Sequence, residues 1–113
     1  MIDQNRNFSI REWQERIFQN NVEHGFYEDD RNFGEVLALI HSELSEALEE
    51  HRDGHSPTEI YFKGDKPEGV PIEMADALIR VLDWFESHNI DAEYAMRIKH
   101  NFNVGRPYKH DKG

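Results

Sequence analysis

The chain has 113 residues, the length of one domain with a modest core, and we expect residues 1–113 to form a single domain. Its 23 acidic residues against 13 basic ones give a formal net charge of −10, which argues against binding to nucleic acids or anionic membranes through the overall field. There is no cysteine, so disulfides, thiolate metal sites and cysteine nucleophiles are excluded. The start of the chain lacks an apolar signal-peptide core, and the longest apolar run, 36–40, is far too short to span a membrane, so we expect a cytoplasmic protein.

The first predicted helix begins after Ser9. Ser9 and Glu12 form a capping-box pattern, a hydroxyl at the N-cap with a glutamate three residues later. Apolar residues then recur at helical spacing as far as Val22, and Gly25 marks the expected end.

The second predicted helix has the clearest pattern in the sequence. It starts near Asp30 or Asn32 and continues to Gly54, with apolar residues separated by three or four positions: Phe33, Val36, Leu37, Ile40, Leu44, Ala47 and Leu48. Residues 54–71 follow with three prolines and three glycines, and they predict a long connection with one short turn. No stretch alternates in polarity over a strand length.

Two further helices complete the chain. Pro71 suits a first helical turn, and an apolar arc runs from Ile72 to about Phe85, after which 88–89 ends the helix. Asp91 is the expected N-cap of the fourth helix, and Gly105 its end. The expected fold is therefore all-α, a protomer resembling a four-helix bundle and completed by oligomerisation.

Two acidic pairs occur in matching surroundings on the second and third helices. Glu43 and Glu46 are followed by Ala-Leu, and thirty positions later Glu73 and Asp76 are followed by Ala-Leu as well. Helical spacing places these acids at the margins of the two apolar stripes. If the helices pack together, four nearby carboxylates repel one another unless a cation neutralises them, and hard cations such as Mg²⁺ prefer oxygen ligands.

Two other interpretations compete with a magnesium site. The acids could form a solvated helix face, an interpretation supported by the i, i+4 pair Asp76 and Arg80. A carboxylate-bridged di-iron or di-manganese bundle would need Glu-x-x-His on two helices, and none of the seven histidines has a glutamate three residues before it. The recurrence of the pair on two helices favours the magnesium site over the solvated face.

The order of these acids resembles the MazG-like branch of the all-α nucleoside triphosphate pyrophosphohydrolases, relatives of the dimeric dUTPases. The shared pattern is E-x-x-E followed, after some two dozen residues, by E-x-x-D. The tail is similar to the substrate-side segment of short family members, with Lys99, Asn103 and Arg106 followed by Pro-Tyr-Lys-His. The resemblance extends from about Phe33 to His110.

This resemblance implies Mg²⁺-dependent hydrolysis of a (deoxy)nucleoside triphosphate between its α and β phosphates, giving a monophosphate and pyrophosphate, with Mn²⁺ as a substitute metal. It also assigns roles to eight residues. The implied metal ligands are Glu43, Glu46 and Asp76, with Glu73 as a ligand or as the base for the attacking water. The implied phosphate-side residues are Lys99, Asn103 and Arg106, with Tyr108 nearby. Independently of the resemblance, the small size of the chain leads us to expect a homo-oligomer, either a dimer or a tetramer.

Several questions stay open at the level of sequence. The alternative function is a non-catalytic helical module that binds a cation or senses nucleotides without hydrolysing them. The residues that contact the base are not identified, although six aromatic residues are candidates: Trp13, Phe26, Tyr27, Tyr61, Phe62 and Trp84.

Overall fold

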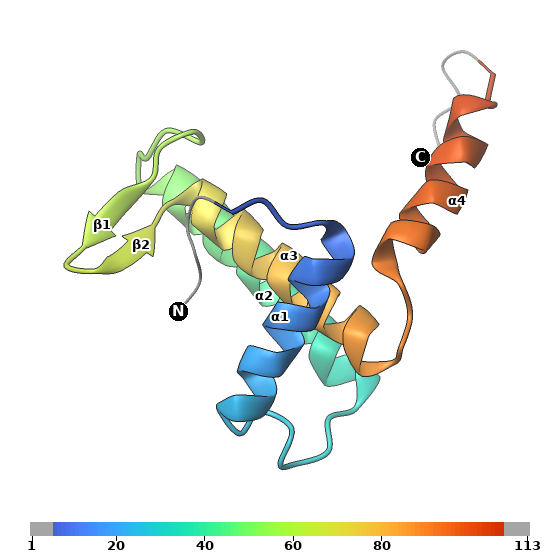
Figure 1. Cartoon of the computed structure of the whole chain (residues 1–113). Coiled ribbons are helices and arrows are strands. Elements are labelled where there is room, and N and C mark those ends of the chain that lie inside the picture. The colour runs from blue at the N-terminus through green and yellow to red at the C-terminus, as the bar shows by residue number, and fades with distance from the viewer. Residues whose placement is uncertain (1–5, 108–113) are drawn as a thin grey trace.

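The computed structural model describes residues 6–107 and contains four α-helices in the predicted order, with a short β-hairpin between the second and third (Figure 1). The elements are α1 (Ile10–Glu23), α2 (Phe33–Arg52), β1 (Tyr61–Lys63), β2 (Lys66–Glu68), α3 (Val70–Ser87) and α4 (Ala92–Val104). The predicted all-α class with four helices is confirmed. No helix within the described part of the chain is both long and apolar enough to cross a bilayer.

Three of the four helices, α1, α2 and α4, begin at predicted caps. Both hydrogen bonds of the capping box are present at α1, where the backbone N–H of Glu12 donates to Ser9 Oγ and the backbone N–H of Ser9 donates to Glu12 Oε1. Asn32 caps α2 and Asp91 caps α4, each by accepting from a backbone N–H in the first turn. These side chains satisfy donors that a helix start leaves unpaired, which is why the boundaries could be read from sequence.

Gly25 turns the chain out of α1 as expected. Its φ of +82° is a left-handed conformation that glycine adopts without strain. The backbone N–H of Gly25 donates to the carbonyl of Val22, and that of Phe26 donates to the carbonyl of Asn21, which is the Schellman arrangement. This turn directs Phe26 and Tyr27 back towards α3.

The hairpin corrects the prediction for 54–71. β1 and β2 pair antiparallel with Tyr61 opposite Glu68, and Gly64 and Asp65 form the two-residue turn. Three-residue strands are too short to show alternating polarity. The Gly-Asp pair between them was the available sequence signal.

α2 and α3 run antiparallel and form the main packing unit, joined by the hairpin segment at one end (Figure 1). Ala47 on α2 and Ala77 on α3 are each only 6% exposed. Small side chains at these positions allow a close approach of the two helices. Because each alanine follows the second acid of its pair, the same contact brings the two acidic pairs together.

α1 packs on α3, and one buried side chain links it to the connection between α3 and α4. Gln14 is fully buried; its amide donates to Glu86 Oε1 (2.8 Å) and to the carbonyl of Ile90 (2.9 Å), and its oxygen accepts from the backbone N–H of Ala92 (3.1 Å). Beyond this link α4 projects away from the other helices (Figure 1).

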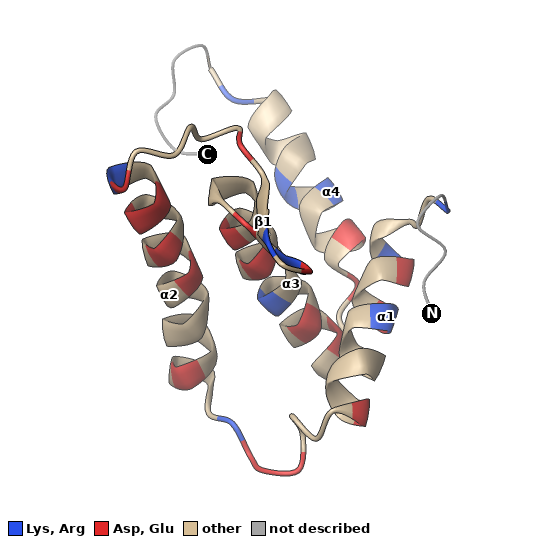
Figure 2. Ribbon diagram, turned by 90° about the vertical axis from the view of Figure 1, so that its left-hand side faces the viewer, with Lys and Arg blue, Asp and Glu red and all other residues tan. Residues whose placement is uncertain are grey.

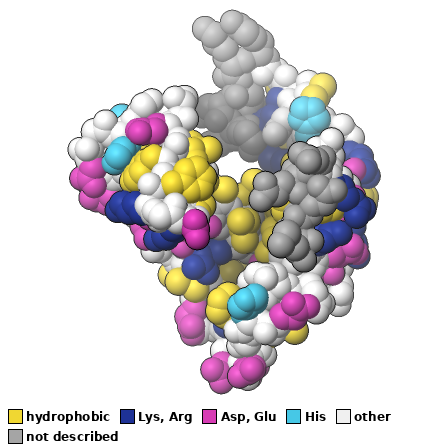
Figure 3. All heavy atoms as spheres, turned by 60° about the vertical axis from the view of Figure 1, so that its left-hand side comes forward, with side chains coloured by type: hydrophobic (Ala, Val, Ile, Leu, Met, Phe, Trp, Pro, Cys, Tyr) yellow, Lys and Arg dark blue, Asp and Glu magenta, His cyan; other side chains and the backbone are white. Residues whose placement is uncertain are grey.

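The protomer leaves much apolar surface uncovered. The buried apolar residues among those described are Ile17, Ala47, Ala77, Leu82 and Ala92, whereas many larger apolar residues are exposed, including most of those on α4. The radius of gyration is 16.4 Å, above the ~13 Å of a compact domain of this size. Figure 3 shows hydrophobic side chains (yellow) gathered on one lobe and in the hollow beside it.

Candidate functional site

Three of the four predicted acids converge where α2 and α3 pack. Glu43, Glu73 and Asp76 each place a carboxylate oxygen within 4.8 Å of the other two. Glu43 is buried, at 9% exposure, and Glu73 is half-buried. Figure 2 shows acidic positions (red) along both α2 and α3.

The oxygen geometry fits a small divalent cation. Two oxygens on opposite sides of a Mg²⁺ ion lie ~4.2 Å apart, given metal–oxygen distances of about 2.0–2.1 Å. The three carboxylate oxygens lie within 4.8 Å of one another, slightly more than this span, so small side-chain rotations would bring them to ligand distance. Three carboxylates would also leave coordination positions for water and for a substrate phosphate, which Mg²⁺ usually retains.

The acids perturb one another strongly. Burial, together with the neighbouring charges of Glu46, Asp76 and Glu43, raises the pKa of Glu73 from 4.5 to about 7. Burial and the charge of Glu43 also raise the pKa of Asp76, and the nearby Arg80 guanidinium opposes that rise. An added cation would relieve this repulsion.

Glu46 takes a different position from the other three acids. It is exposed and falls outside the group of converging oxygens, yet its charge acts on Glu73. Its role as a direct ligand stays a prediction.

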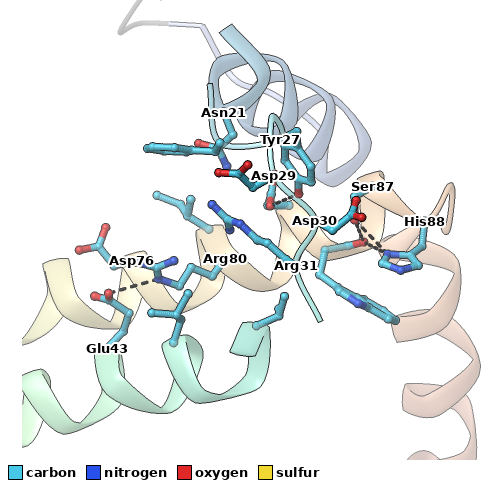
Figure 4. A pocket seen from close by; sticks show the side chains of 16 residues that line it. Asn21, Tyr27, Asp29, Asp30, Arg31, Glu43, Asp76, Arg80, Ser87 and His88 are labelled. Atoms are coloured by element: carbon cyan, nitrogen blue, oxygen red, sulfur yellow. Dashed lines mark hydrogen bonds and ion pairs between the residues drawn. The ribbon is translucent and has the colours of Figure 1, made fainter. Parts of the chain in front are cut away.

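A cavity of about 620 Å³ lies beside the acids, bounded by α2, α3 and the segment between α1 and α2 (Figure 4). Glu43 and Asp76 line one end, where Arg80 Nε donates to Glu43 Oε1 over 3.2 Å. Arg80 therefore provides a positive charge inside the cavity, next to the carboxylates.

The other end of the cavity is aromatic and polar. Phe26, Tyr27 and Trp84 line it, together with Asp83, and the guanidinium of Arg31 lies 5.7 Å and 5.6 Å from the ring centres of Phe26 and Tyr27. The Tyr27 hydroxyl donates to Asp83 Oδ2. Burial and this hydrogen bond raise the pKa of Tyr27 to about 12, so the hydroxyl keeps its proton. Of the six aromatic candidates, Trp13, Tyr61 and Phe62 do not line the cavity.

The predicted phosphate-side residues are not part of this cavity. Lys99 and Asn103 belong to α4, Arg106 lies two residues after its end, and none of the three lines the cavity of its own chain. Figure 2 shows the basic positions of α4 (blue) apart from the acids of α2 and α3. Lys99 and Arg106 lie 5.0 Å and 5.3 Å from the ring centre of Phe102. Tyr108 lies outside the described residues.

Arg80 and Asp83 are among the cavity residues that sequence reasoning did not assign to the site. Arg80 was noted as an i, i+4 partner of Asp76 and taken as support for a solvated face, but it reaches across to Glu43 on the other helix. Asp83 follows Asp76 by seven positions, which places both on one side of α3. That spacing was the available signal for Asp83.

A comparison with protein-family models, curated proteins and solved structures found no match to this chain.

Proposed function

We propose that this protein hydrolyses a (deoxy)nucleoside triphosphate between its α and β phosphates, as members of the MazG-like family do, with Mg²⁺ as cofactor and Mn²⁺ as a substitute. The observation that carries the proposal is the convergence of Glu43, Glu73 and Asp76, from two helices, beside a cavity large enough for a nucleotide. The recurrent acidic pairs and the geometry thus point to the same chemistry.

In the proposed reaction a water oxygen attacks the α phosphorus, and the bond from that phosphorus to the bridging oxygen of the β phosphate breaks. Pyrophosphate leaves and a monophosphate remains. When bound, the metal would polarise the phosphate oxygens and offset the charge that develops on them. Glu43 and Asp76 would hold it.

The chain's own residues supply the remaining steps. Glu73 accepts the proton of the attacking water, a role for which a carboxyl pKa raised towards neutrality is suited. Arg80 offers a guanidinium to the phosphates from within the cavity. The Arg80 guanidinium is paired with Glu43. We infer that a cation bound by Glu43 breaks this pair and leaves Arg80 able to contact the substrate.

We further infer that the active species is a homo-oligomer. The chain exposes 8792 Å², whereas a compact monomer of 13.4 kDa exposes about 6,500 Å². The excess of roughly 2,000 Å² exceeds the ~800 Å² that each partner buries in an ordinary stable interface. In such an assembly α4 of a second copy can bring its Lys99 and Asn103 to the cavity of the first copy. The same two residues of the first copy do not line that cavity.

The test is a screen of ribo- and deoxyribonucleoside triphosphates with Mg²⁺, with the products identified by phosphorus NMR. The proposal predicts pyrophosphate and a monophosphate from at least one substrate, and no products with Asp76→Asn. Orthophosphate as the first product would contradict the reaction. Nucleotide binding without any product would favour the alternative, a non-catalytic sensor.

A further inference from the structure

The aromatic end of the cavity contains a buried carboxyl group that the proposed hydrolysis does not use. Asp83 is 7% exposed, and although Tyr27 donates to its Oδ2, its Oδ1 has no hydrogen-bond partner among residues 6–107. Buried polar atoms are nearly always hydrogen-bonded, because leaving an acceptor unpaired is unfavourable. A ligand that donates to Oδ1 would remove this penalty.

The position of Asp83 fits one part of a nucleotide. Asp76, Arg80, Asp83 and Ser87 all line the cavity and occupy one side of α3. Figure 4 shows Asp76, Arg80 and Ser87 in succession along this helix. Asp83 is seven residues beyond Asp76, about 10 Å along the helix axis. A nucleotide with its phosphates beside Asp76 and Arg80 would extend its sugar and base towards Asp83.

We propose that Asp83 reads the base by accepting a hydrogen bond at Oδ1 from an exocyclic amino group, so that cytosine and adenine are preferred to uracil and hypoxanthine. This inference rests on the proposed function, because it assumes a nucleotide in the cavity. Phe26 and Trp84 line the same end and offer aromatic faces for stacking.

The preference for an amino group follows from donor and acceptor chemistry. An ionised carboxyl group only accepts hydrogen bonds, and Tyr27 already donates to Oδ2, so one oxygen remains for the base. Cytosine and adenine present an amino donor where uracil and hypoxanthine present a carbonyl acceptor. Uracil and hypoxanthine each carry a ring N–H that is also a donor, but a carbonyl oxygen lies beside it, on both sides in uracil and on one side in hypoxanthine, and would approach the same carboxyl group.

Access of a base to Oδ1 requires a local movement of the protein. The oxygen exposes almost no surface to solvent, so a base reaches it only if a neighbouring group moves. Tyr27 lies in the connection between α1 and α2, outside any helix, and is the neighbour bonded to the same carboxyl group. A small shift of this connection would admit the base and keep the bond to Oδ2.

The experiment measures binding of the uncharged nucleosides cytidine, uridine, adenosine and inosine by NMR titration, in EDTA. Without metal and phosphates, the result is independent of hydrolysis. We expect cytidine to bind about 10- to 100-fold more tightly than uridine, and adenosine more tightly than inosine by a similar factor, which is the effect of one hydrogen bond to a charged group.

Asp83→Asn is the decisive variant, because the asparagine amide keeps the shape and can accept from Tyr27 while it presents its NH₂ to the ligand. It should abolish the preference or reverse it. Tyr27→Phe keeps Oδ1 and should retain the preference, and so should Asp30→Asn, which changes an exposed acid of the same lining.

Equal binding of the amino and carbonyl nucleosides by the wild type, or no binding of any, overturns the inference, as does a preference that survives in Asp83→Asn. Hydrolysis without discrimination would retain the proposed function and remove the base assignment. Discrimination between the nucleosides without hydrolysis would retain the base assignment and remove the proposed function.

Discussion

Replacing Glu73 by glutamine should make the metal-free protein more stable above neutral pH. The raised pKa of Glu73 means that, between pH 4.5 and about 7, the folded protein binds more protons than the unfolded chain. The free energy of unfolding therefore falls as the pH rises through this window. Glutamine carries no charge at any pH, so Glu73→Gln should remove much of this loss.

The size of the effect follows from the two pKa values. A shift from 4.5 to about 7 corresponds to ~3 kcal/mol for a group shielded from water. Glu73 is only half-buried, and solvent screening reduces the expected gain at pH 8 to about 1–2 kcal/mol. At pH 4.5 the two proteins should differ little. Saturating Mg²⁺ should narrow the difference at pH 8, because both proteins keep Glu43 and Asp76 and gain ~2.7 kcal/mol at a hundred times the dissociation constant, while the ion also offsets the repulsion on Glu73 in the wild type.

The assay is urea unfolding at one protein concentration, from pH 4.5 to 8, in EDTA and then in Mg²⁺. Glu35→Gln is the matched control, since Glu35 also lies in the first turn of a helix but is eight residues, about 12 Å, from Glu43 along α2. The control should be slightly less stable than the wild type, through loss of a charge that favours the helix N-terminus. If Glu73→Gln is no more stable than the wild type in EDTA at pH 8, burial and the neighbouring carboxylates do not disfavour the charged form of Glu73, and the reasoning is refuted.

The remaining predictions concern catalysis, substrate binding, backbone geometry and assembly. Glu73→Gln should lower turnover about 10²- to 10⁴-fold while nucleotide still binds; turnover within threefold of the wild type, about 0.7 kcal/mol, would exclude it as the base. Lys99→Ala should raise the KM about tenfold and leave Mg²⁺ affinity in the absence of nucleotide unchanged, as kinetics and calorimetry would show; an unchanged KM removes Lys99 from the phosphate site. Gly69→Ala should lower the free energy of unfolding, measured in urea, by about 1–3 kcal/mol, because the φ of Gly69 is +119° and an added Cβ would lie 2.4 Å from the carbonyl oxygen of Glu59. Wild-type stability of this variant would contradict the geometry. Light scattering at micromolar concentration should give at least a dimer, and a monomer would contradict the assembly.

The helices could be predicted from sequence because their determinants are local. Ser9, Asn32 and Asp91 bond to backbone groups within three residues, and Gly25 ends α1 through its own conformation. The acids could be found because both pairs are followed by Ala-Leu, and the alanine of each pair lies at the contact between α2 and α3. The hairpin was missed because its strands are shorter than any readable alternation.

The site was less accessible to sequence reasoning because it depends on contacts distant in the chain. Asp83 acquires its role through Tyr27, 56 positions away, and Arg80 through Glu43, 37 positions away. The direction of α4 likewise depends on Gln14, a polar residue whose burial no periodic pattern indicates. Periodicity places a residue on a face of its helix and does not say what lies opposite.

The most direct test of the central claim, that the converging carboxylates form a divalent-metal site, is calorimetric titration of the metal-free protein with Mg²⁺, repeated with Mn²⁺. The account predicts saturable binding that Asp76→Asn weakens severely and that Glu35→Gln leaves unchanged. Undiminished binding in Asp76→Asn, or no binding by the wild type, would contradict it and leave the acids as a solvated helix face.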